Sequence, residues 1–318
     1  MRIKHLVLSG GGLKGVSFLG SLEYLQRNKC IDLSMIETFA GSSAGALISA
    51  LLVIGYTVAE IFKLIHDCDI ESLAEPDVTQ LLTKFGIESG FRIMSVFTEM
   101  FRLKGHSDTI TFAQLFAKTQ KRLVVTATCL GEGIKYFDHI NHPNVSVLLA
   151  IRMSISVPLL FTSVQYEGRH YVDGGVLDNV PIAVLRDKPV TEVLTLSIVD
   201  QDEDGSVTSF PAYLNLLIAT VMKEIENIRR EHRSYNRHHQ ASIFIATGPH
   251  KLSVSNEEKR ELFRLGYLAA KRYVDSDKYL MLQIETLPHA IARKIWHYNH
   301  RKHFRFVLTC ISRQKKIS

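Results

Sequence analysis

A serine between two glycines stands where a nucleophile could be presented. Residues 41–45 read Gly-Ser-Ser-Ala-Gly, which places Ser43 at the centre of a G-x-S-x-G pattern. Gly41 and Gly45 permit the tight turn that exposes a hydroxyl between a strand and a helix, and the N-terminus of that helix favours a developing alkoxide. The pattern alone is weak evidence for an active site, but the apolar strand before it and the small-residue helix after it supply the context that this chemistry requires.

An aspartate followed by two glycines offers a base for that serine. Asp173 ends an apolar segment and precedes Gly174 and Gly175, so its carboxylate would be displayed at a strand end. A Ser–His–Asp triad is the default expectation for an activated serine, but none of the 14 histidines has a comparably distinctive setting. Judged alone, the triplet is equally well explained by an Asp turn between a strand and a loop.

A glycine cluster near the start of the chain could bind an anion. Residues 10–15 read Gly-Gly-Gly-Leu-Lys-Gly and lie between an apolar segment and a helical pattern. The spacing formally matches a dinucleotide-binding turn, but residues 40–43 (Ala-Gly-Ser-Ser) stand where the required acidic residue should end the second strand. Lys14 is not followed by the Ser or Thr of a phosphate-binding loop. Two interpretations of the glycine cluster remain. Its backbone N–H groups at a helix N-terminus could bind an anionic group, or the cluster could form a tight turn without a ligand.

The three motifs together resemble, in order and character, the signatures of the patatin-like phospholipase family. The resemblance extends to a block of small residues, a proline and an aromatic residue before the aspartate: Ala150 through Ser154, Ser156, Pro158 and Phe161. It covers the chain up to about Val199, and nothing specific matches beyond that point. Three ordered motifs are a much stronger signal than any one of them.

The resemblance implies a Ser–Asp dyad in which Ser43 is the nucleophile and Asp173 accepts its proton, without a histidine. It also implies an oxyanion hole from the backbone of the glycine loop, and a role for Lys14 in fixing that loop or adding positive potential. The implied oxyanion residues are Gly10, Gly11 and Gly12, and the implied supporting glycines are Gly41, Gly45, Gly174 and Gly175. The implied reaction cleaves a glycerophospholipid or lysophospholipid ester through an acyl-enzyme, with no metal ion and no cofactor.

Strands and helices that alternate along the chain would position these residues. Strands are expected at 3–9, 35–40, 122–129, 135–138, 166–172, 193–199 and 242–246, and helices at 16–28, 46–54, 145–153, 212–232 and 256–274. This alternation predicts an α/β fold, and the resemblance implies a patatin-like three-layer sandwich with a mostly parallel central sheet flanked by helices. We expect a catalytic core at residues 1–200 and a helical, basic C-terminal extension at 201–318, packed on the same domain. A mostly helical insertion without sheet is expected at about 60–110.

The composition is that of a chain that buries a core, because 46% of its 318 residues are hydrophobic and 22% are charged. The four cysteines lack the spacing of a disulfide framework or a zinc site, which favours a reducing, intracellular setting. The sequence shows no signal peptide and no apolar run long enough to cross a bilayer, so we expect a cytoplasmic or peripherally membrane-bound protein. The acidic loop at 202–204 lacks the ligand pattern of a calcium site.

The net charge of +6 is concentrated at the C-terminus. Residues 286–318 contain no Asp or Glu and eight basic residues: Arg293, Lys294, Arg301, Lys302, Arg305, Arg313, Lys315 and Lys316. This basic segment could rest on an anionic membrane, or it could form a final helix and strand with solvated charges. A neutral-lipid lipase and a catalytically idle membrane- or nucleic-acid-binding protein remain as alternatives. Nucleic-acid binding is disfavoured, because an idle scaffold has no need of both Ser43 and Asp173.

Removing residues 286–318 is expected to weaken binding to anionic vesicles more than it weakens hydrolysis of a soluble ester. The reason is that each basic residue near an anionic surface contributes about 1 kcal/mol of attraction. Vesicle co-sedimentation and a nitrophenyl ester assay measure the two effects. An insoluble truncated protein would show instead that this segment belongs to the folded core.

Overall fold

The protein was analysed as a computed structural model that describes residues 3–68, 77–200, 207, 210–231, 242–247 and 254–276. Its strands are β1 (His5–Leu8), β2 (Thr38–Gly41), β3 (Gly86–Glu88), β4 (Arg122–Cys129), β5 (Gly133–Phe137), β6 (Leu159–Phe161), β7 (Val164–Tyr166), β8 (Arg169–Asp173), β9 (Val193–Asp200) and β10 (Ser242–Thr247). Its helices are α1 (Val16–Arg27), α2 (Ala44–Val53), α3 (Val58–Asp67), α4 (Leu81–Lys84), α5 (Phe91–Leu103), α6 (Phe112–Thr119), α7 (Val147–Ser154), α8 (Phe210–Glu231) and α10 (Asn256–Val274).

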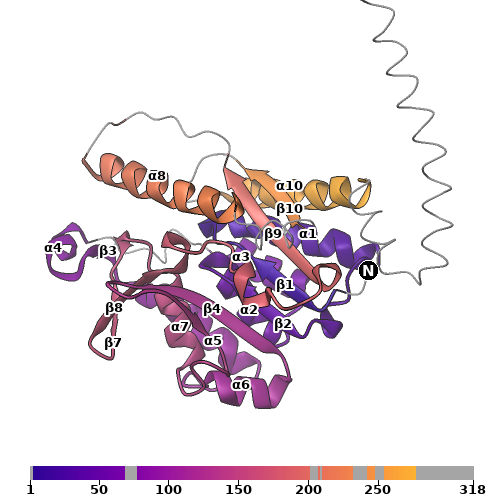
Figure 1. Ribbon diagram of the computed structural model, residues 1–318, viewed down its shortest axis with the longest axis horizontal. Coiled ribbons are helices and arrows are strands. Elements are labelled where there is room, and N and C mark those ends of the chain that lie inside the picture. The colour runs from indigo at the N-terminus through magenta and orange to yellow at the C-terminus, as the bar shows by residue number, and fades with distance from the viewer. Residues whose placement is uncertain are drawn as a thin grey trace, which may run out of the picture.

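A mostly parallel sheet forms the centre of the molecule (Figure 1). Its strand order is β10-β9-β1-β2-β4-β8-β7, and β5 also pairs with β4. The five strands from β10 to β4 run parallel to one another, whereas β8 and β5 run antiparallel to β4 and β7 runs antiparallel to β8. The expected α/β architecture, a mostly parallel central sheet flanked by helices, is therefore confirmed.

Both faces of the sheet are buried, as a parallel sheet requires. Successive residues of β1 point to opposite faces, so Leu6 and Leu8 join the main core with the helices while Val7 joins a second, smaller cluster. The second cluster is closed by apolar residues of the segment at 180–185, which contains a short 3-10 helix (Ile182–Leu185). The alternation along the strands thus explains why the sheet is covered on two sides.

The segment at 60–110 contains a short strand that its sequence pattern does not predict. The described part of this segment contains helices α3, α4 and α5, in agreement with its predicted helical character, but β3 pairs in parallel with β6 to form a small second sheet. A strand of three residues is too short to produce a recognisable alternation, so the expectation of no sheet in this segment was wrong. The acidic loop at 202–204 and the basic segment at 286–318 lie outside the described residues.

Helices α1 and α10 pack closely where each has a glycine. A Cβ on Gly20 would collide with the carbonyl of Phe263, and a Cβ on Gly266 would collide with the carbonyl of Ser17. The Ser21 hydroxyl donates to the Gly266 carbonyl at 2.8 Å across this contact. Ser255 caps α10, because its hydroxyl accepts a hydrogen bond from the N–H of Glu258. The close approach therefore fixes α10 on α1.

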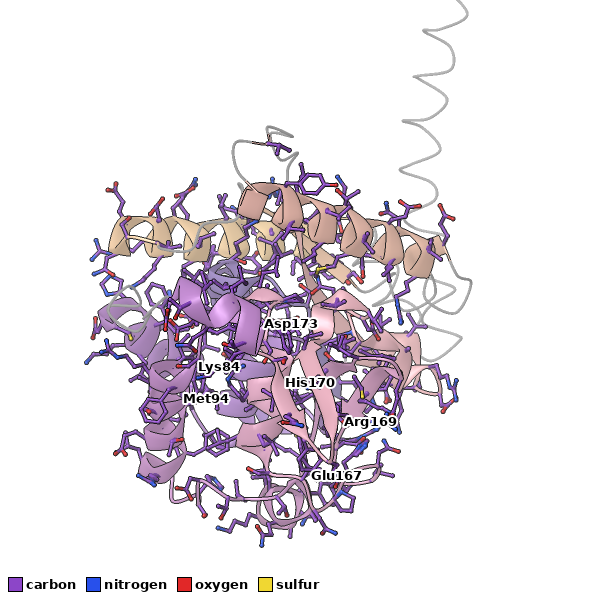
Figure 2. All side chains as sticks on the ribbon, turned by 90° about the vertical axis from the view of Figure 1, so that its left-hand side faces the viewer. Lys84, Met94, Glu167, Arg169, His170 and Asp173 are labelled. Carbon is purple, nitrogen blue, oxygen red and sulfur yellow. The ribbon has the colours of Figure 1, made fainter. Side chains whose placement is uncertain are left out.

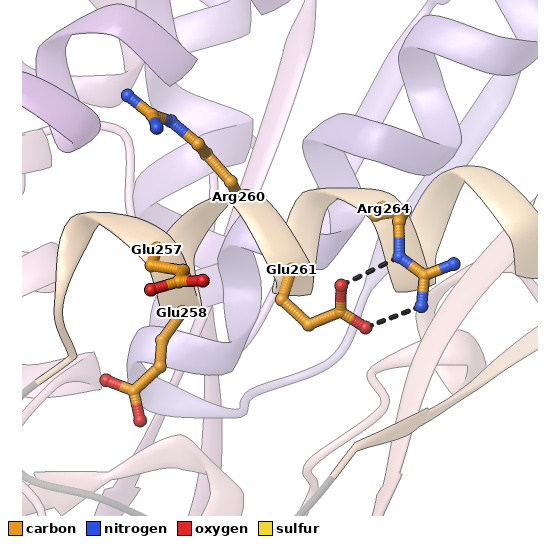
Figure 3. Close-up of a pocket in the computed structure, with 5 residues that line it drawn as sticks. All are labelled: Glu257, Glu258, Arg260, Glu261 and Arg264. Carbon is orange, nitrogen blue, oxygen red and sulfur yellow. Dashed lines mark hydrogen bonds and ion pairs between the residues drawn. The ribbon is translucent and has the colours of Figure 1, made fainter.

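The outer face of α10 carries charged side chains and none of the three motifs. A shallow hollow there is lined by Glu257, Glu258, Arg260, Glu261 and Arg264 (Figure 3). The guanidinium of Arg264 forms two hydrogen bonds of 2.7 Å with the carboxylate of Glu261. This hollow is an exposed charged surface of a single helix. Among the described residues, no helix has the length and apolar character needed to cross a bilayer.

Replacing Gly266 by Ala should destabilise the protein by about 1–3 kcal/mol, the usual cost of overpacking a close contact. This loss should outweigh the gain of about 1 kcal/mol that Ala brings over Gly within a helix. Urea unfolding measures the change, and Lys271→Ala on the exposed side of the same helix is the matched control, expected within about 0.5 kcal/mol of the parent. An unchanged midpoint for Gly266→Ala would contradict this account of the α1–α10 contact.

Candidate active site

Ser43 occupies a strained turn between β2 and α2. Its φ of 49° and ψ of −122° lie in a region that residues with a side chain rarely adopt. The turn is compact, since a Cβ on Gly45 would collide with the carbonyls of Leu8 and Ser9, and a Cβ on Gly41 would collide with Gly45. The two glycines of the G-x-S-x-G pattern are therefore required by close backbone approach, and the serine between them carries the strain.

Strand β4 brings Ser43 and Asp173 to the same place. Gly41 at the end of β2 lies opposite Val125, and Asp173 at the end of β8 lies opposite Ala127. These partners are two residues apart on β4, about 7 Å at the usual strand rise. Figure 2 shows Asp173 at the end of β8 nearest the long helices, with His170 and Arg169 further along the strand. The sheet thus juxtaposes the two residues that the motifs singled out.

Two serines at the end of α7 and just after it form hydrogen bonds with the backbones of the candidate dyad. The N–H of Ser43 donates to the hydroxyl of Ser154 at 2.9 Å. The N–H of Asp173 donates to the carbonyl of Ser156 at 2.8 Å, and the hydroxyl of Ser156 accepts a hydrogen bond from the partly buried Arg152 guanidinium. The small-residue block that preceded the aspartate in the sequence therefore has a structural purpose.

The carboxyl group of Asp173 is buried, and its pKa is raised to about 7. Burial is the largest cause, because removal from water disfavours the charged form. The Ser43 hydroxyl and the N–H of Gly175, which donates to Oδ1 at 2.7 Å, favour the charged form and limit the rise. The Ser43 hydroxyl lies close enough to the Asp173 carboxyl to lower its pKa, although the two groups do not meet the geometry of a hydrogen bond. Oδ2 of Asp173 has no hydrogen-bond partner among the described residues. A carboxyl with this pKa can exchange a proton near neutral pH.

The glycine loop before α1 lies beside Ser43. A Cβ on Gly10 would lie 3.2 Å from the Cβ of Ser43. The N–H of Gly10 already donates to the carbonyl of Asn179 at 3.1 Å, which leaves the N–H groups of Gly11 and Gly12 as the better candidates to bind an oxyanion. Lys14 is buried, and its backbone N–H donates to the Gly11 carbonyl at 3.1 Å, so it helps to close the turn.

Asn179 connects the glycine loop with the turn that follows Asp173, and no sequence motif identifies it as a site residue. Its carbonyl accepts the N–H of Gly10, and its side-chain oxygen lies 2.8 Å from the position that a Cβ of Gly175 would take. The same oxygen would collide with a Cβ on Gly10. An asparagine six residues after Asp173 gives no distinctive sequence signal, because its partner, Gly10, lies on a loop near the start of the chain.

Three histidines that could serve as a base in place of Asp173 have other contacts. His139 stacks on Phe116 with ring centroids 3.7 Å apart, and Nδ1 of His142 lies 3.0 Å from the carbonyl of Tyr136. Nδ1 of His170 lies 3.0 Å from the hydroxyl of Ser163. These three side chains therefore engage groups other than Ser43 and Asp173.

The comparison with protein families agrees with this geometry. The family described as patatin-like phospholipase matches residues 6–186, more than half of the chain, including all three motifs. This chain belongs to the patatin-like phospholipase family. The family assignment confirms the resemblance drawn from the glycine loop, the G-x-S-x-G turn and the Asp-Gly-Gly triplet, and it identifies the chain as a member of a family of lipid hydrolases.

Two relatives are viral proteins. Uncharacterized protein R571 of Acanthamoeba polyphaga mimivirus is 32% identical over 211 residues, which cover 65% of this chain and 69% of that protein. Probable lipid hydrolase 463L of Invertebrate iridescent virus 6 is 37% identical over 190 residues, which cover 57% of this chain and 62% of that protein. The match to the second relative thus spans less than two thirds of its length.

A solved structure has the same fold. The crystal structure of VipD from Legionella pneumophila aligns with a TM-score of 0.64 and 18% sequence identity, covering 86% of this chain and 67% of that chain. At this identity the likeness concerns the fold alone. It includes most of the patatin-like core and therefore supports the topology described above.

Replacing Asp173 by Asn should stabilise the folded protein above pH 7 and have little effect near pH 4. The pKa of Asp173 is raised in the folded protein, so as pH increases from about 4 to 7 the unfolded chain loses this proton first and the parent loses stability. Asn carries no charge and avoids this penalty, so the variant should gain on the order of 1–4 kcal/mol at pH 8.

Urea unfolding of parent and variant at pH 4.5 and pH 8 measures this difference. Asp187→Asn is the control, because the side chain of Asp187 is 91% exposed and should show no comparable dependence on pH. An equal effect of Asp173→Asn at both pH values would contradict the raised pKa.

Proposed function

We propose that this protein is a serine acyl hydrolase that cleaves glycerophospholipid or lysophospholipid esters with a Ser43–Asp173 dyad. The observation that carries the proposal is the placement of a strained serine turn beside a buried carboxyl whose pKa is raised to about 7. A serine needs a base near the operating pH, and Asp173 meets this need without a histidine.

In the first half of the reaction, Asp173 accepts the hydroxyl proton of Ser43 as the serine oxygen attacks the ester carbonyl. The carbonyl oxygen becomes negative, and the N–H groups of Gly11 and Gly12 would stabilise it, helped by the positive end of the adjoining helix. When the tetrahedral intermediate collapses, the carbon–oxygen bond to the alcohol breaks and the alcohol leaves with the proton from Asp173. The product of this half is an acyl-enzyme at Ser43.

In the second half, water replaces the alcohol. Asp173 takes a proton from the water as its oxygen attacks the acyl-enzyme, and the same proton returns to Ser43 when the fatty acid leaves. The N–H of Ser43 is held by Ser154 throughout this cycle, and the N–H of Asp173 is held by Ser156. These bonds would keep the reacting oxygens in register while charge moves between them.

Contact with a lipid surface is part of this proposal. Helix α8 has large apolar side chains that are about half exposed: Tyr213, Leu217, Val221 and Ile228. Their spacing of four, four and seven residues places them on one side of the helix. The basic segment at 286–318 would add attraction to anionic headgroups. The family's association with phospholipids favours these over neutral lipids as substrates.

A fluorophosphonate probe should label Ser43, and Ser43→Ala should abolish both the labelling and the hydrolysis of a short-chain nitrophenyl ester. Ser42→Ala is the matched control and should keep both, because the Ser42 hydroxyl is buried and has no hydrogen-bond partner among the described residues. Mass spectrometry of the labelled peptide identifies the residue. Equal labelling of Ser43→Ala would rule out this nucleophile.

Asp173→Asn should reduce turnover by at least about 100-fold, within the range expected for loss of a general base. His139, His142 and His170 should each tolerate replacement by Gln with ester hydrolysis retained, because the dyad uses no imidazole. Loss of hydrolysis in a folded variant of any one of them would show that the base is a histidine.

A further inference from the structure

An ion pair between a partly buried arginine and a buried aspartate joins α8 to the turn that follows Asp173. Nη1 of Arg229 lies 3.4 Å from Oδ2 of Asp178, whose side chain is fully buried. The hydroxyl of Tyr136 donates to the same oxygen at 2.5 Å. Arg229 belongs to α8, Tyr136 to β5 and Asp178 to the turn, so three distant segments of the chain meet at a single carboxylate oxygen.

Asp178 is linked through the backbone to the candidate base. Its N–H donates to the carbonyl of Gly174 at 2.8 Å, and the N–H of Gly175 donates to Oδ1 of Asp173. The next residue, Asn179, accepts the N–H of Gly10. A shift of Asp178 would therefore displace both the base and the glycine loop.

The same side of α8 covers this turn. Cε of Met222 lies 3.4 Å from the position that a Cβ of Gly175 would take. Residues 222 and 229 are separated by two helical turns and share one face of the helix. Figure 1 shows α8 lying across the molecule above the sheet, and Figure 2 shows Asp173 below the helices on that side. One face of α8 thus carries both an anchor, Arg229, and a cover, Met222.

We propose that Arg229 and Tyr136 are positioning residues: by holding Asp178 they dock α8 on the 173–179 turn, keep Asp173 in register with Ser43 and place Met222 as an apolar cover beside it. This inference rests on the proposed function. It assigns to α8, which lies beyond the matched family region, a part in the chemistry of the core.

The groups around Asp178 are consistent with an ion pair to Arg229 that persists at neutral pH. Burial raises the pKa of Asp178 to about 6, and the charge of Glu226 adds to the rise, whereas Arg229 and Tyr136 oppose it. Asp178 is therefore mostly ionised at pH 7 and attracts Arg229. Burial of the Asp178 carboxylate is costly and offsets much of its attraction to the partly buried Arg229, so the pair is better explained by positioning than by a gain in stability.

Undocking of α8 would leave a specific signature. The groups that act on the Asp173 carboxyl are the Ser43 hydroxyl and the Gly175 N–H, which both favour ionisation, and burial, which opposes it. If water reached Asp173, the effect of burial would weaken and its pKa would fall. The acid limb of the pH–rate profile would then move to lower pH while the maximal rate decreased. A loss of general stability would not produce this combination in the folded fraction.

The test is Arg229→Met, measured as the rate of fluorophosphonate labelling of Ser43 and as nitrophenyl ester hydrolysis between pH 5 and 9. The plateau kcat should fall about 10–100-fold, as expected for a small displacement of reacting groups. The acid limb should move to lower pH, and KM for the short ester should change little. Met222→Ala should move the acid limb in the same direction with a smaller loss of kcat. An unchanged plateau and limb in Arg229→Met would overturn the inference.

Two further variants keep the test decisive. Lys223→Met, on the exposed side of the same helix, should leave the plateau and the acid limb unchanged. Arg229→Met could unfold the protein by leaving Asp178 unpaired, so Asp178→Asn is combined with it, because an amide retains an acceptor for Tyr136 without a buried charge. This double variant should be folded by circular dichroism and still show the lowered plateau and shifted limb. A parental rate in the folded double variant would overturn the inference.

The parent protein separates this inference from the function on which it rests. If labelling and hydrolysis in the parent do not depend on Ser43, the proposed function fails. If they depend on Ser43 but are insensitive to Arg229→Met, only the role of α8 fails.

Discussion

The candidate active site depends on the pairing of strand β4 with the ends of two other strands, β2 and β8. Strands β2 and β8 run toward each other along the same edge of β4, opposite the edge that β5 occupies, and they end opposite Val125 and Ala127. The hydroxyl of Thr126, between these two residues, lies 3.4 Å from the Gly41 carbonyl and would be struck by a Cβ on Gly174. The separation of the serine turn from the aspartate turn is therefore set by the regular rise of one central strand, which makes it insensitive to the lengths of the surrounding loops.

The conformations of the serine turn and the aspartate turn are locally unfavourable in free energy, and contacts with the surrounding structure offset this cost. Ser43 adopts an unfavourable backbone conformation, and Asp173 has a buried carboxyl. The backbone bonds to Ser154 and Ser156 come from the end of α7, which packs on β4 and β8, so the same helix stabilises both turns. Strain and burial of this kind persist only where packing over-determines the local structure, and they are common where stability is sacrificed for activity.

The parts of the protein that could be predicted from the sequence are those defined by particular residue types within a few positions of one another. The glycine loop, the serine turn and the Asp-Gly-Gly triplet each need glycines within a few residues of a reactive group, and the longer strands show clear apolar patterns. Strands β3, β6 and β7 are only three residues long and produce no such pattern. Asn179, Tyr136 and Arg229 were missed for another reason. They are ordinary polar residues whose partners lie far away in the sequence, so only the folded chain reveals their pairing.

In the proposed mechanism the base is a carboxyl group, and this would explain why the fold covers it. An imidazole has a pKa of about 6.5 in water and can act as a base near neutral pH without burial, whereas a carboxyl with a pKa of about 4 is too weak. Asp173 reaches the required range because water is excluded from it, and burial is the largest cause of its raised pKa. A histidine dyad could tolerate an open site, but an aspartate dyad requires one that is dry around the carboxyl. In the proposed mechanism, the elements that pack on the 173–179 turn, including α8, would therefore influence the chemistry as well as the shape of the site.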